Sequence, residues 1–453
     1  MSGCLIGTPV NESYFLTNPV VNYSHRSRRN AGGFSSAEAI ELLQRCKKFN
    51  HIKLIHSKII KTGLIYDQLL VRKLLALCFS FGKTDYANCV FDQVNQPLTY
   101  TWNLMIREYS LHGFSYQAIL LYNRMISLGF QPDKFTFPFV IKACLGCSAL
   151  DKGKEVHGQA IKAGLYNDTF VRNTLMDLYF KFGDLDSGCS LFETTRVRTI
   201  VSWTTFVAGL IACGQLDAAY QAFNRMPERN VVSWTAIING CVKHQRPQEA
   251  FDLFSRMQLE NVRPNEYTVV SLLKACSQLG SLSLGSWIHD CALKSGFKLG
   301  PFLGSALIDM YSKCGSLDSA RQVYENIQSK TLVCWNTMIT SLGVHGCADE
   351  ALVLFAQMEI QQVRPDAITF VGVLCACVSK NDVNEGERLF KRMTNWYRIK
   401  PTKEHYDCLA ELYSRAYQMD KIPEPGNGSP SKVNALSWAT ATHPYNVAPH
   451  GAE

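Results

Sequence analysis

One apolar pattern occurs four times along the chain and constrains its fold more than any other feature. Each copy opens on a tryptophan, has an alanine 16 residues later, and ends on a methionine. The four tryptophans are Trp102, Trp203, Trp234 and Trp335. Between these markers, apolar residues recur three and four positions apart, which is the period of an amphipathic helix and not of a strand. Two such stripes separated by turn residues predict a helical hairpin in each copy.

The same spacing continues beyond the four copies and divides the chain from 34 to 402 into eleven units. The units are 34–67, 68–98, 99–133, 134–168, 169–199, 200–230, 231–265, 266–300, 301–331, 332–366 and 367–402. Most are 35 or 31 residues long, and because four residues make about one helical turn, the apolar stripe keeps its phase. A single hairpin cannot bury both of its stripes, so neighbouring units must stack. We therefore expect an all-α solenoid of stacked helical hairpins, with the Trp, Met and Phe side chains in its core.

The two ends of the chain differ from the repeated region. Residues 1–33 contain a single acidic residue, Glu12, together with several Ser, Asn and Arg. This composition predicts an organellar transit peptide, with an ordinary disordered terminus as the alternative. Residues 403–422 supply one helix and then lose the pattern, as a truncated twelfth repeat would. Five prolines in 423–453 indicate a flexible tail.

Composition narrows the class of protein. The 17 cysteines have no recurring disulfide spacing and lie mostly on apolar helix faces, as small buried residues in a reducing compartment do. The sequence has no run of about 18 apolar residues, so it predicts no membrane span. A net charge of +8 is compatible with an anionic partner but is weak evidence for one.

The sequence contains no recognisable catalytic constellation. Cys144 and Cys147 form a lone Cys-x-x-Cys pair on a predicted helix, which is more typical of a structural coincidence than of a metal site. Gly82 precedes Lys-Thr, but the upstream glycine of a phosphate-binding loop is missing. We expect no catalytic residue, no metal and no cofactor, so that the chain binds and does not catalyse.

Three segments carry a specific family resemblance. The segment 231–265 reads VVSWTAIINGCVKHQRPQEAFDLFSRMQLENVRPN and resembles a plant pentatricopeptide repeat, as do 332–366 and 307–327. The resemblance covers roughly 34–422, and the alternation of unit lengths is similar to the PLS subfamily. It implies a right-handed superhelix, with tetratricopeptide-like hairpins, that binds single-stranded RNA in a plant organelle. Such repeats read one base each. The implied organelle is the chloroplast, with the mitochondrion as the alternative.

In this family the fifth and the last residue of each repeat select a base. Carried over to this chain, the implied pairs are Asn103 with Asp133, Pro138 with Asp168, Asn173 with Thr199, Thr204 with Asn230, Thr235 with Asn265, and Asn336 with Asp366. The implied RNA reads U, pyrimidine, pyrimidine, A, A, two unread positions, and U from 5′ to 3′. The pairs Val270 with Gly300 and Ser305 with Thr331 depart from the readable combinations, as do Glu38 and Arg72 at the fifth position of the leading units.

The second residue of each repeat flanks the base in this family. In this chain these residues are apolar or aromatic: Tyr100, Phe135, Phe170, Val201, Val232, Tyr267, Phe302 and Val333, followed by Ile368. An aromatic platform for a base contributes roughly 1–3 kcal/mol. Lys181, Lys243 and Lys313 match a family position near the phosphates, but only three of the eleven units have a lysine there.

Each of these residues also has an ordinary structural interpretation. Asp133, Asn265 and Asp366 directly precede a new helix, where Asp and Asn are common N-caps. Asn103 and Asn336 are alternatively solvated residues of a first helical turn. The second-position row is alternatively a set of packing contacts between repeats.

The resemblance implies a protein that positions an RNA-processing activity supplied in trans, such as C-to-U editing. Many members of the PLS subfamily continue into E and DYW regions, the latter a zinc deaminase. In this sequence no histidine is followed two residues later by glutamate, as that deaminase requires. Alternatives are a factor for transcript stability or splicing, a helical scaffold that binds proteins, and a degenerate gene product with an interrupted last repeat.

Overall fold

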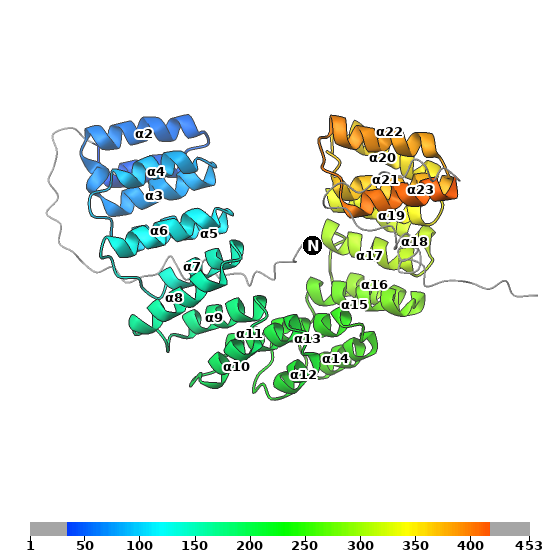
Figure 1. Ribbon diagram of the computed structural model, residues 1–453, viewed down its shortest axis with the longest axis horizontal. Helices are drawn as coiled ribbons and strands as arrows, with labels where there is room; N and C mark the ends of the chain where they lie inside the picture. The colour runs from blue at the N-terminus through cyan, green and yellow to red at the C-terminus, as the bar shows by residue number, and fades with distance from the viewer. Residues whose placement is uncertain (1–33, 417–453) are drawn as a thin grey trace, which may run out of the picture. The chain divides into compact units, whose positions relative to one another are not determined.

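The structure is a computed structural model that describes residues 34–416 (Figure 1). The predicted transit peptide, the predicted tail and the last residues of the truncated repeat lie outside this described part. The described chain forms two compact units, one up to Ala149 and the other from Leu150 onward. All its regular elements are helices. Among the described residues, no helix has both the length and the apolar character needed to cross a membrane.

The first unit consists of seven α-helices and one short 3-10 helix. They are α1 (Ser36–Gln44), α2 (Phe49–Lys61), η2 (Leu64–Tyr66), α3 (Gln68–Ser80), α4 (Thr84–Asp92), α5 (Thr99–Leu111), α6 (Ser115–Ser127) and α7 (Thr136–Gly146). The first helix of each hairpin packs against the first helix of the next, from α1 through α3 and α5 to α7. The second helix of a hairpin packs on its own partner, as α6 does on α5, and also contacts the following first helix.

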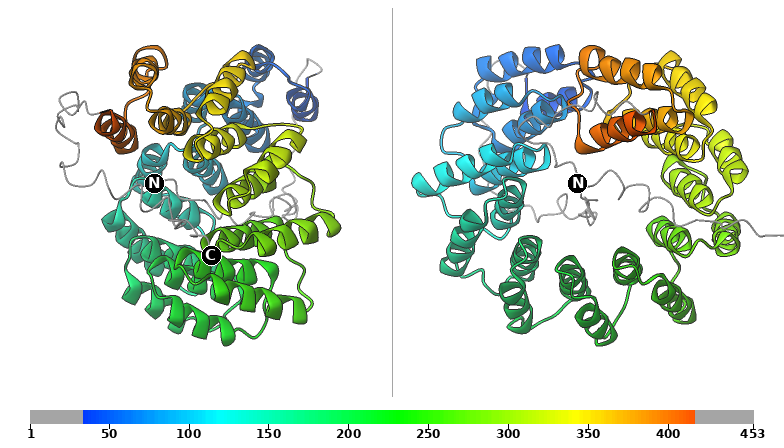
Figure 2. Two further views of the ribbon diagram at one scale, coloured as in Figure 1. Left: turned by 90° about the vertical axis from the view of Figure 1, so that its right-hand side faces the viewer. Right: turned by 45° about the vertical axis from the view of Figure 1, so that its right-hand side comes forward.

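The second unit repeats this arrangement over a longer stretch. Its helices are α8 (Leu150–Lys162), α9 (Thr169–Lys181), α10 (Leu185–Glu193), α11 (Ile200–Ala212), α12 (Leu216–Asn224), α13 (Val231–Lys243), α14 (Pro247–Leu259), α15 (Glu266–Leu279), α16 (Leu282–Lys294), α17 (Pro301–Lys313), α18 (Leu317–Asn326), α19 (Leu332–Val344), α20 (Ala348–Ile360), α21 (Ala367–Lys380), α22 (Val383–Lys391), η3 (Arg392–Trp396) and α23 (Lys403–Arg415). The odd-numbered helices stack in sequence from α9 to α23, and Figure 2 shows the hairpins side by side. The predicted all-α fold of stacked hairpins is confirmed.

The difference between long and short units lies in the second helix. In the 35-residue unit 231–265 the second helix α14 has 13 residues, whereas in the 31-residue unit 200–230 the second helix α12 has nine. The four missing residues are about one turn at the end of the helix. Met226 therefore follows α12 while Met257 lies inside α14, yet both side chains are buried. The apolar stripe keeps its phase, as the sequence predicts.

The tryptophans that open the repeats lie in the core. Trp234 is fully buried and packs edge-to-face on Phe223, with ring centroids 4.7 Å apart. The Arg256 guanidinium lies 5.7 Å from the same indole ring and covers it. Close approach of the first helices depends on small residues, because a Cβ at Gly240 would lie only 2.7 Å from the Ile211 side chain. Any larger residue at Gly240 would force the Ile211 side chain to move.

The boundary between the two compact units falls inside one predicted repeat, 134–168. Its first helix α7 belongs to one unit and its second helix α8 to the other. Helix α8 buries only Gly153, Val156 and Ala160. In α6, by comparison, an isoleucine, a leucine, a tyrosine and a methionine are buried. The apolar stripe seen in the sequence does not reveal this boundary.

Candidate nucleic-acid interface

In most of the repeats with an implied base-selecting pair, the last residue caps the first helix of the next repeat. Oδ1 of Asp133 accepts hydrogen bonds from the backbone N–H groups of Phe135 and Thr136 at 2.9 and 3.0 Å. The same capping role is filled in the second unit by Asp168, Thr199, Asn230, Asn265 and Asp366. The interpretation of Asp133, Asn265 and Asp366 as N-caps is therefore confirmed. A carboxylate or an amide has a second polar atom, so an Asp or Asn side chain that caps a helix can still bind another partner.

Asn103 and Asp133 form a direct side-chain pair in the first unit. Nδ2 of Asn103 donates to Oδ1 of Asp133 at 2.9 Å, and Oδ1 of Asn103 accepts from the Thr136 hydroxyl at 2.6 Å. Only 8% of Asn103 is exposed, and Thr136 is fully buried. The interpretation of Asn103 as a solvated first-turn residue is therefore wrong. Asp133 and Thr136 hold the Asn103 amide, which has one N–H left to donate.

Asn336 and Asp366 repeat this arrangement in the second unit. Nδ2 of Asn336 donates to Oδ1 of Asp366 at 2.9 Å, and the Thr369 hydroxyl donates to Oδ1 of Asn336 at 2.6 Å. Asn336 is 5% exposed, so the solvated first-turn interpretation is wrong here too. For Oδ2 of Asp366 the structure records no hydrogen bond within residues 34–416, which leaves an acceptor beside the remaining N–H of Asn336.

Thr235 and Asn265 are arranged more loosely. The Thr235 hydroxyl lies 2.7 Å from both the Val231 carbonyl oxygen and the Thr268 hydroxyl, and 3.4 Å from Oδ1 of Asn265. Oδ1 of Asn265 accepts from the backbone N–H of Thr268 at 2.9 Å. The Asn265 amide therefore keeps its N–H groups for another partner, while the Thr235 oxygen can still accept a hydrogen bond.

The other implied pairs are not joined directly by any hydrogen bond recorded in the described part. The Thr204 hydroxyl donates to the Ile200 carbonyl, and Asn230 caps α13. Oδ1 of Asn173 is buried without a hydrogen-bond partner, because Thr199 instead pairs with Ser202. At the remaining pair, buried Pro138 has no side-chain donor or acceptor.

Sequence reasoning missed the third residue of the following repeat. Thr136, Thr268 and Thr369 are fully buried in the first turn of α7, α15 and α21. Each hydroxyl contacts both the fifth and the last residue of the preceding repeat. The sequence does contain a sign of this contact. Asn103 and Asn336 are each followed by Asp 30 positions later and by Thr 33 positions later.

The second residues of the repeats are mostly exposed on the first helices. The exposed members are Tyr100, Phe170, Val201, Tyr267, Phe302, Val333 and Ile368. Phe135 and Val232 are half-buried. Exposure of 63% for Tyr267 and 58% for Val333 excludes buried packing as their main role. The rings of Tyr267 and Phe302 lie 5.0 Å apart on successive repeats, so they form an apolar surface next to the polar pairs.

Charged groups near this row differ among the repeats. The guanidinium of Arg72, the fifth residue of its repeat, lies 4.7 Å from the Tyr100 ring centre. Lys181 pairs with Asp177 at 2.7 Å and Lys313 with Asp309 at 2.9 Å, so nearby carboxylates partly neutralise both lysines. Lys243 is exposed at the end of α13. The lysine positions are therefore a weak electrostatic feature.

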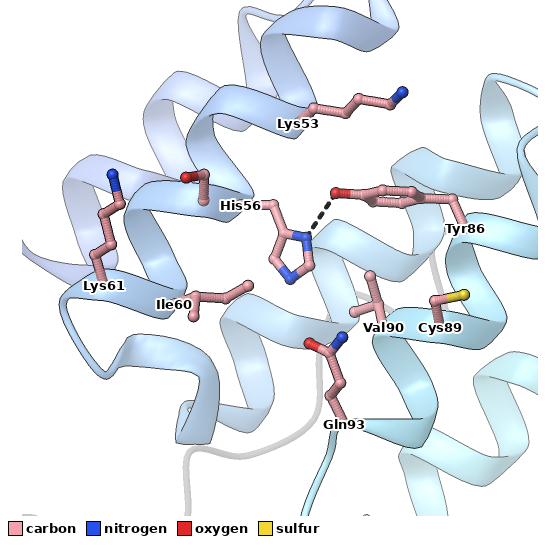
Figure 3. A pocket seen from close by; sticks show the side chains of 9 residues that line it. Lys53, His56, Ile60, Lys61, Tyr86, Cys89, Val90 and Gln93 are labelled. Atoms are coloured by element: carbon pink, nitrogen blue, oxygen red, sulfur yellow. Dashed lines mark hydrogen bonds between the residues drawn. The ribbon is translucent and has the colours of Figure 1, made fainter.

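A separate cleft of about 330 Å³ lies between α2 and α4 in the first unit (Figure 3). Nδ1 of His56 lies 2.7 Å from the Tyr86 hydroxyl, and Lys53 and Lys61 line the rim. Burial lowers the pKa of His56, which favours its neutral form. The cleft is formed by second helices and lacks the polar pairs of the first helices. Across residues 34–416 no three His, Cys, Asp or Glu side chains are grouped to hold a metal ion.

Comparisons with known proteins agree with the repeat pattern. A model of the PPR repeat family matches 229–278 and 330–379, and a model of the PPR repeat matches 100–130, 170–196, 201–231, 305–332 and 368–396. The crystal structure of the pentatricopeptide repeat protein PPR10 from maize has a similar fold, with a TM-score of 0.57 and 15% identity. That similarity covers 85% of this chain and 67% of the maize chain.

Proteins of Arabidopsis thaliana are similar over most of the chain. Pentatricopeptide repeat-containing protein At3g26630, chloroplastic, is 59% identical over 390 residues, which are 86% of this chain and 86% of that protein. Pentatricopeptide repeat-containing protein At5g66520 is 42% identical over 88% of this chain and 65% of its own length. For the chloroplastic protein CRR2 the identity is 33%, over 81% of this chain and 52% of its own length. The chain thus spans from about half to most of these relatives.

Proposed function

The chain belongs to the pentatricopeptide repeat family, and we propose that it binds single-stranded RNA in the chloroplast, with each polar pair meeting one unpaired base. The observation that carries this proposal is the repeated Asn–Asp pair beside an exposed apolar row. Asn336 with Asp366 and Asn103 with Asp133 have the same hydrogen bonds in two separate units. A recurring polar geometry next to a stacking surface is what recognition of single-stranded RNA requires.

The atoms that remain available in an Asn–Asp pair suit uracil. Nδ2 of Asn336 has a second N–H, and Oδ2 of Asp366 is an acceptor. Uracil offers carbonyl oxygens to the N–H and its own N3–H to the carboxylate. Cytosine has an acceptor at N3, which the carboxylate would repel. The pair therefore favours uracil over cytosine at the first and eighth nucleotides of the implied RNA.

A Thr–Asn pair offers a different set of atoms. Oδ1 of Asn265 is occupied by the backbone N–H of Thr268, so its amide N–H faces the base as a donor. Adenine accepts at N1 and donates from its amino group, which the Thr235 hydroxyl oxygen can accept. This complementarity supports adenine at the fifth nucleotide. Tyr267 and Phe302, whose rings lie 5.0 Å apart and contact each other, offer an exposed aromatic surface on which the sixth base would stack without being selected.

The repeats act as a binding scaffold, so any RNA-processing chemistry is supplied by another protein. The alternation of long and short second helices in α14 and α12 supports assignment to the PLS subfamily. We assign the chain a role in positioning a processing activity, with C-to-U editing as one case and transcript stability or splicing as others. The chloroplast is supported by the similarity to two proteins named as chloroplastic.

The experiment that tests this function is crosslinking in isolated chloroplasts, followed by sequencing of the RNA bound to the full-length protein. The expected result is one enriched transcript segment that contains U, two pyrimidines, two adenines, two variable positions and U. Purified protein should bind the same sequence as a synthetic oligonucleotide. Binding to peptides with no affinity for that oligonucleotide would overturn the proposal in favour of a protein-binding scaffold.

A further inference from the structure

We infer that the threonine at the third position of a repeat is a positioning residue that fixes the base-selecting amide of the preceding repeat. The residues concerned are Thr136 for Asn103 and Thr369 for Asn336. This inference rests on the proposed function, because it describes how the base preference of one repeat depends on a residue of the next repeat. It adds a residue of the following repeat to the fifth and last residues that select the base.

The Thr369 hydroxyl has two acceptors within hydrogen-bond distance, Oδ1 of Asn336 at 2.6 Å and Oδ1 of Asp366 at 3.0 Å, and the first is the better one. Oδ1 of Asp366 already accepts from the backbone N–H of Thr369 at 2.9 Å and from Nδ2 of Asn336 at 2.9 Å. The shortest contact of the hydroxyl, 2.6 Å, is to Oδ1 of Asn336. The hydroxyl oxygen in turn accepts from the backbone N–H of Asp366 at 3.0 Å. The Thr369 hydroxyl therefore donates to Oδ1 of Asn336 and accepts from the backbone N–H of Asp366.

This donation decides which group Asn336 presents to a base. With Oδ1 engaged by Thr369, Nδ2 is turned toward Asp366, and its second N–H is directed out of the pair. Without the hydroxyl, Oδ1 would be a buried acceptor without a partner, which is costly. The amide would then rotate to find a donor, and Nδ2 would leave both Asp366 and the base. Thr136 holds Asn103 by the same contact at 2.6 Å.

The chain contains a natural comparison at Asn173. The third residue of the following repeat is Ser202, and its hydroxyl is used by Thr199 at 3.1 Å instead of by Asn173. Oδ1 of Asn173 is buried without a hydrogen-bond partner. The inference therefore assigns weaker base selection to Asn173 than to Asn103 and Asn336, although all three are asparagines at the fifth position.

The test uses purified full-length protein and a set of RNA oligonucleotides that carry U or C at the first or the eighth nucleotide. Thr369→Val keeps the side-chain volume and removes the hydroxyl. We expect the preference for U over C to fall about tenfold at the eighth nucleotide and to stay unchanged at the first. Thr136→Val should lower the preference for U at the first nucleotide and leave it unchanged at the eighth. Thr369→Ser should restore the preference, because serine keeps the hydroxyl.

A matched control separates positioning from helix capping. Ser233 is also a buried third residue, and its hydroxyl accepts from the backbone N–H of the N-cap residue Asn230 at 3.1 Å. No hydrogen bond from Ser233 to the fifth residue Thr204 is recorded among residues 34–416. Ser233→Ala should lower the thermal unfolding midpoint as Thr369→Val does, with no change in base preference at the fourth nucleotide, to which Thr204 and Asn230 are assigned. If Thr369→Val does not fold, Thr136→Val reports the same role.

The outcomes distinguish this inference from the proposed function. A wild-type protein that binds the oligonucleotides without preferring U at either position would overturn both. A wild type that prefers U at both positions, with Thr369→Val and Thr136→Val keeping that preference in full, would overturn the inference alone. A position-specific loss that serine restores would support it.

Discussion

Asn336 and Asp366 lie 30 positions apart in the sequence, and a hydrogen bond of 2.9 Å joins the amide nitrogen to the carboxylate oxygen. Asn103 and Asp133 have the same separation and the same distance. In both cases the aspartate also caps the first helix of the next repeat. One side chain thus fixes where a helix begins and what the preceding repeat presents to a base.

Replacement of Asn265 by aspartate should change the base that is preferred at one nucleotide. Aspartate caps a helix as well as asparagine does, so the hydrogen bond from the Thr268 backbone N–H is kept. The outward amide donor becomes an acceptor, which suits N1–H of guanine instead of N1 of adenine. We expect preference at the fifth nucleotide to move from A to G by roughly ten- to a hundredfold. Binding of oligonucleotides that differ only at this nucleotide measures the change.

The control for the added charge is Asn261→Asp, because Asn261 is an exposed turn residue in the same repeat. This variant should leave the preference for A unchanged. Equal loss of affinity for all four bases in Asn265→Asp would instead mean that Asn265 only caps α15.

Removal of one exposed ring should weaken RNA binding without affecting stability. Tyr267 is 63% exposed in the second-position row, and Tyr116 is 63% exposed on the second helix α6. We expect Tyr267→Ala to reduce affinity by about 1–3 kcal/mol through lost stacking. Tyr116→Ala should have no effect on RNA affinity. Fluorescence anisotropy with a labelled oligonucleotide measures both, and equal affinities for the two variants would contradict a stacking role for this row.

Trp234 is expected to contribute strongly to stability. It is fully buried against Phe223, so Trp234→Ala should reduce the free energy of unfolding by about 3–5 kcal/mol. Trp234→Phe should cost less, because the indole Nε1–H has no hydrogen-bond partner in the wild type and its loss removes an unsatisfied donor. Chemical denaturation followed by circular dichroism measures these effects. A cost of Trp234→Ala below about 1 kcal/mol would place the ring outside a well-packed core.

Two half-buried histidines predict a loss of stability in mild acid. His157 and His289 lie 2.8 and 2.9 Å from the Tyr179 and Tyr311 hydroxyls. Burial lowers the pKa of both; the charge of Arg172 lowers the pKa of His157 further, and Asp290 partly opposes the shift at His289. In the unfolded chain a histidine has a pKa of about 6.5. The unfolded state therefore takes up protons first as pH falls, and stability decreases below this pH.

The measurement is the free energy of unfolding between about pH 7.5 and pH 5, a range that brackets the pKa of an unfolded histidine. The double variant His157→Asn/His289→Asn should show a shallower decrease below pH 6.5 than the wild type. Identical pH profiles for the wild type and the double variant would exclude His157 and His289 as the cause.

Most of the fold follows from the sequence because each repeat is defined by local spacing. The units that begin at Val231 and Leu332 coincide with the first residues of α13 and α19. The division inside the repeat 134–168 did not follow, because α8 buries the same kinds of residue as α16, which lies within one unit.

The candidate site was predicted less completely than the fold. The capping role of Asp366 follows from its place before a helix, and its separation from Asn336 follows from the repeat length. The role of Thr369 did not follow, because a threonine in a first helical turn is ordinary until the preceding repeat is seen to lie against its hydroxyl. Sequence spacing identifies partners along the chain more readily than buried contacts across the stacking interface.

The measurement that tests the central claim most directly is photocrosslinking of an oligonucleotide that carries 4-thiouridine at the unread sixth nucleotide, with the crosslinked peptides identified by mass spectrometry. The account predicts crosslinks to Tyr267 or Phe302, the exposed rings at the start of α15 and α17. Crosslinks confined to the second helices α14 and α16 would place the RNA on the opposite face of the hairpins and contradict the account.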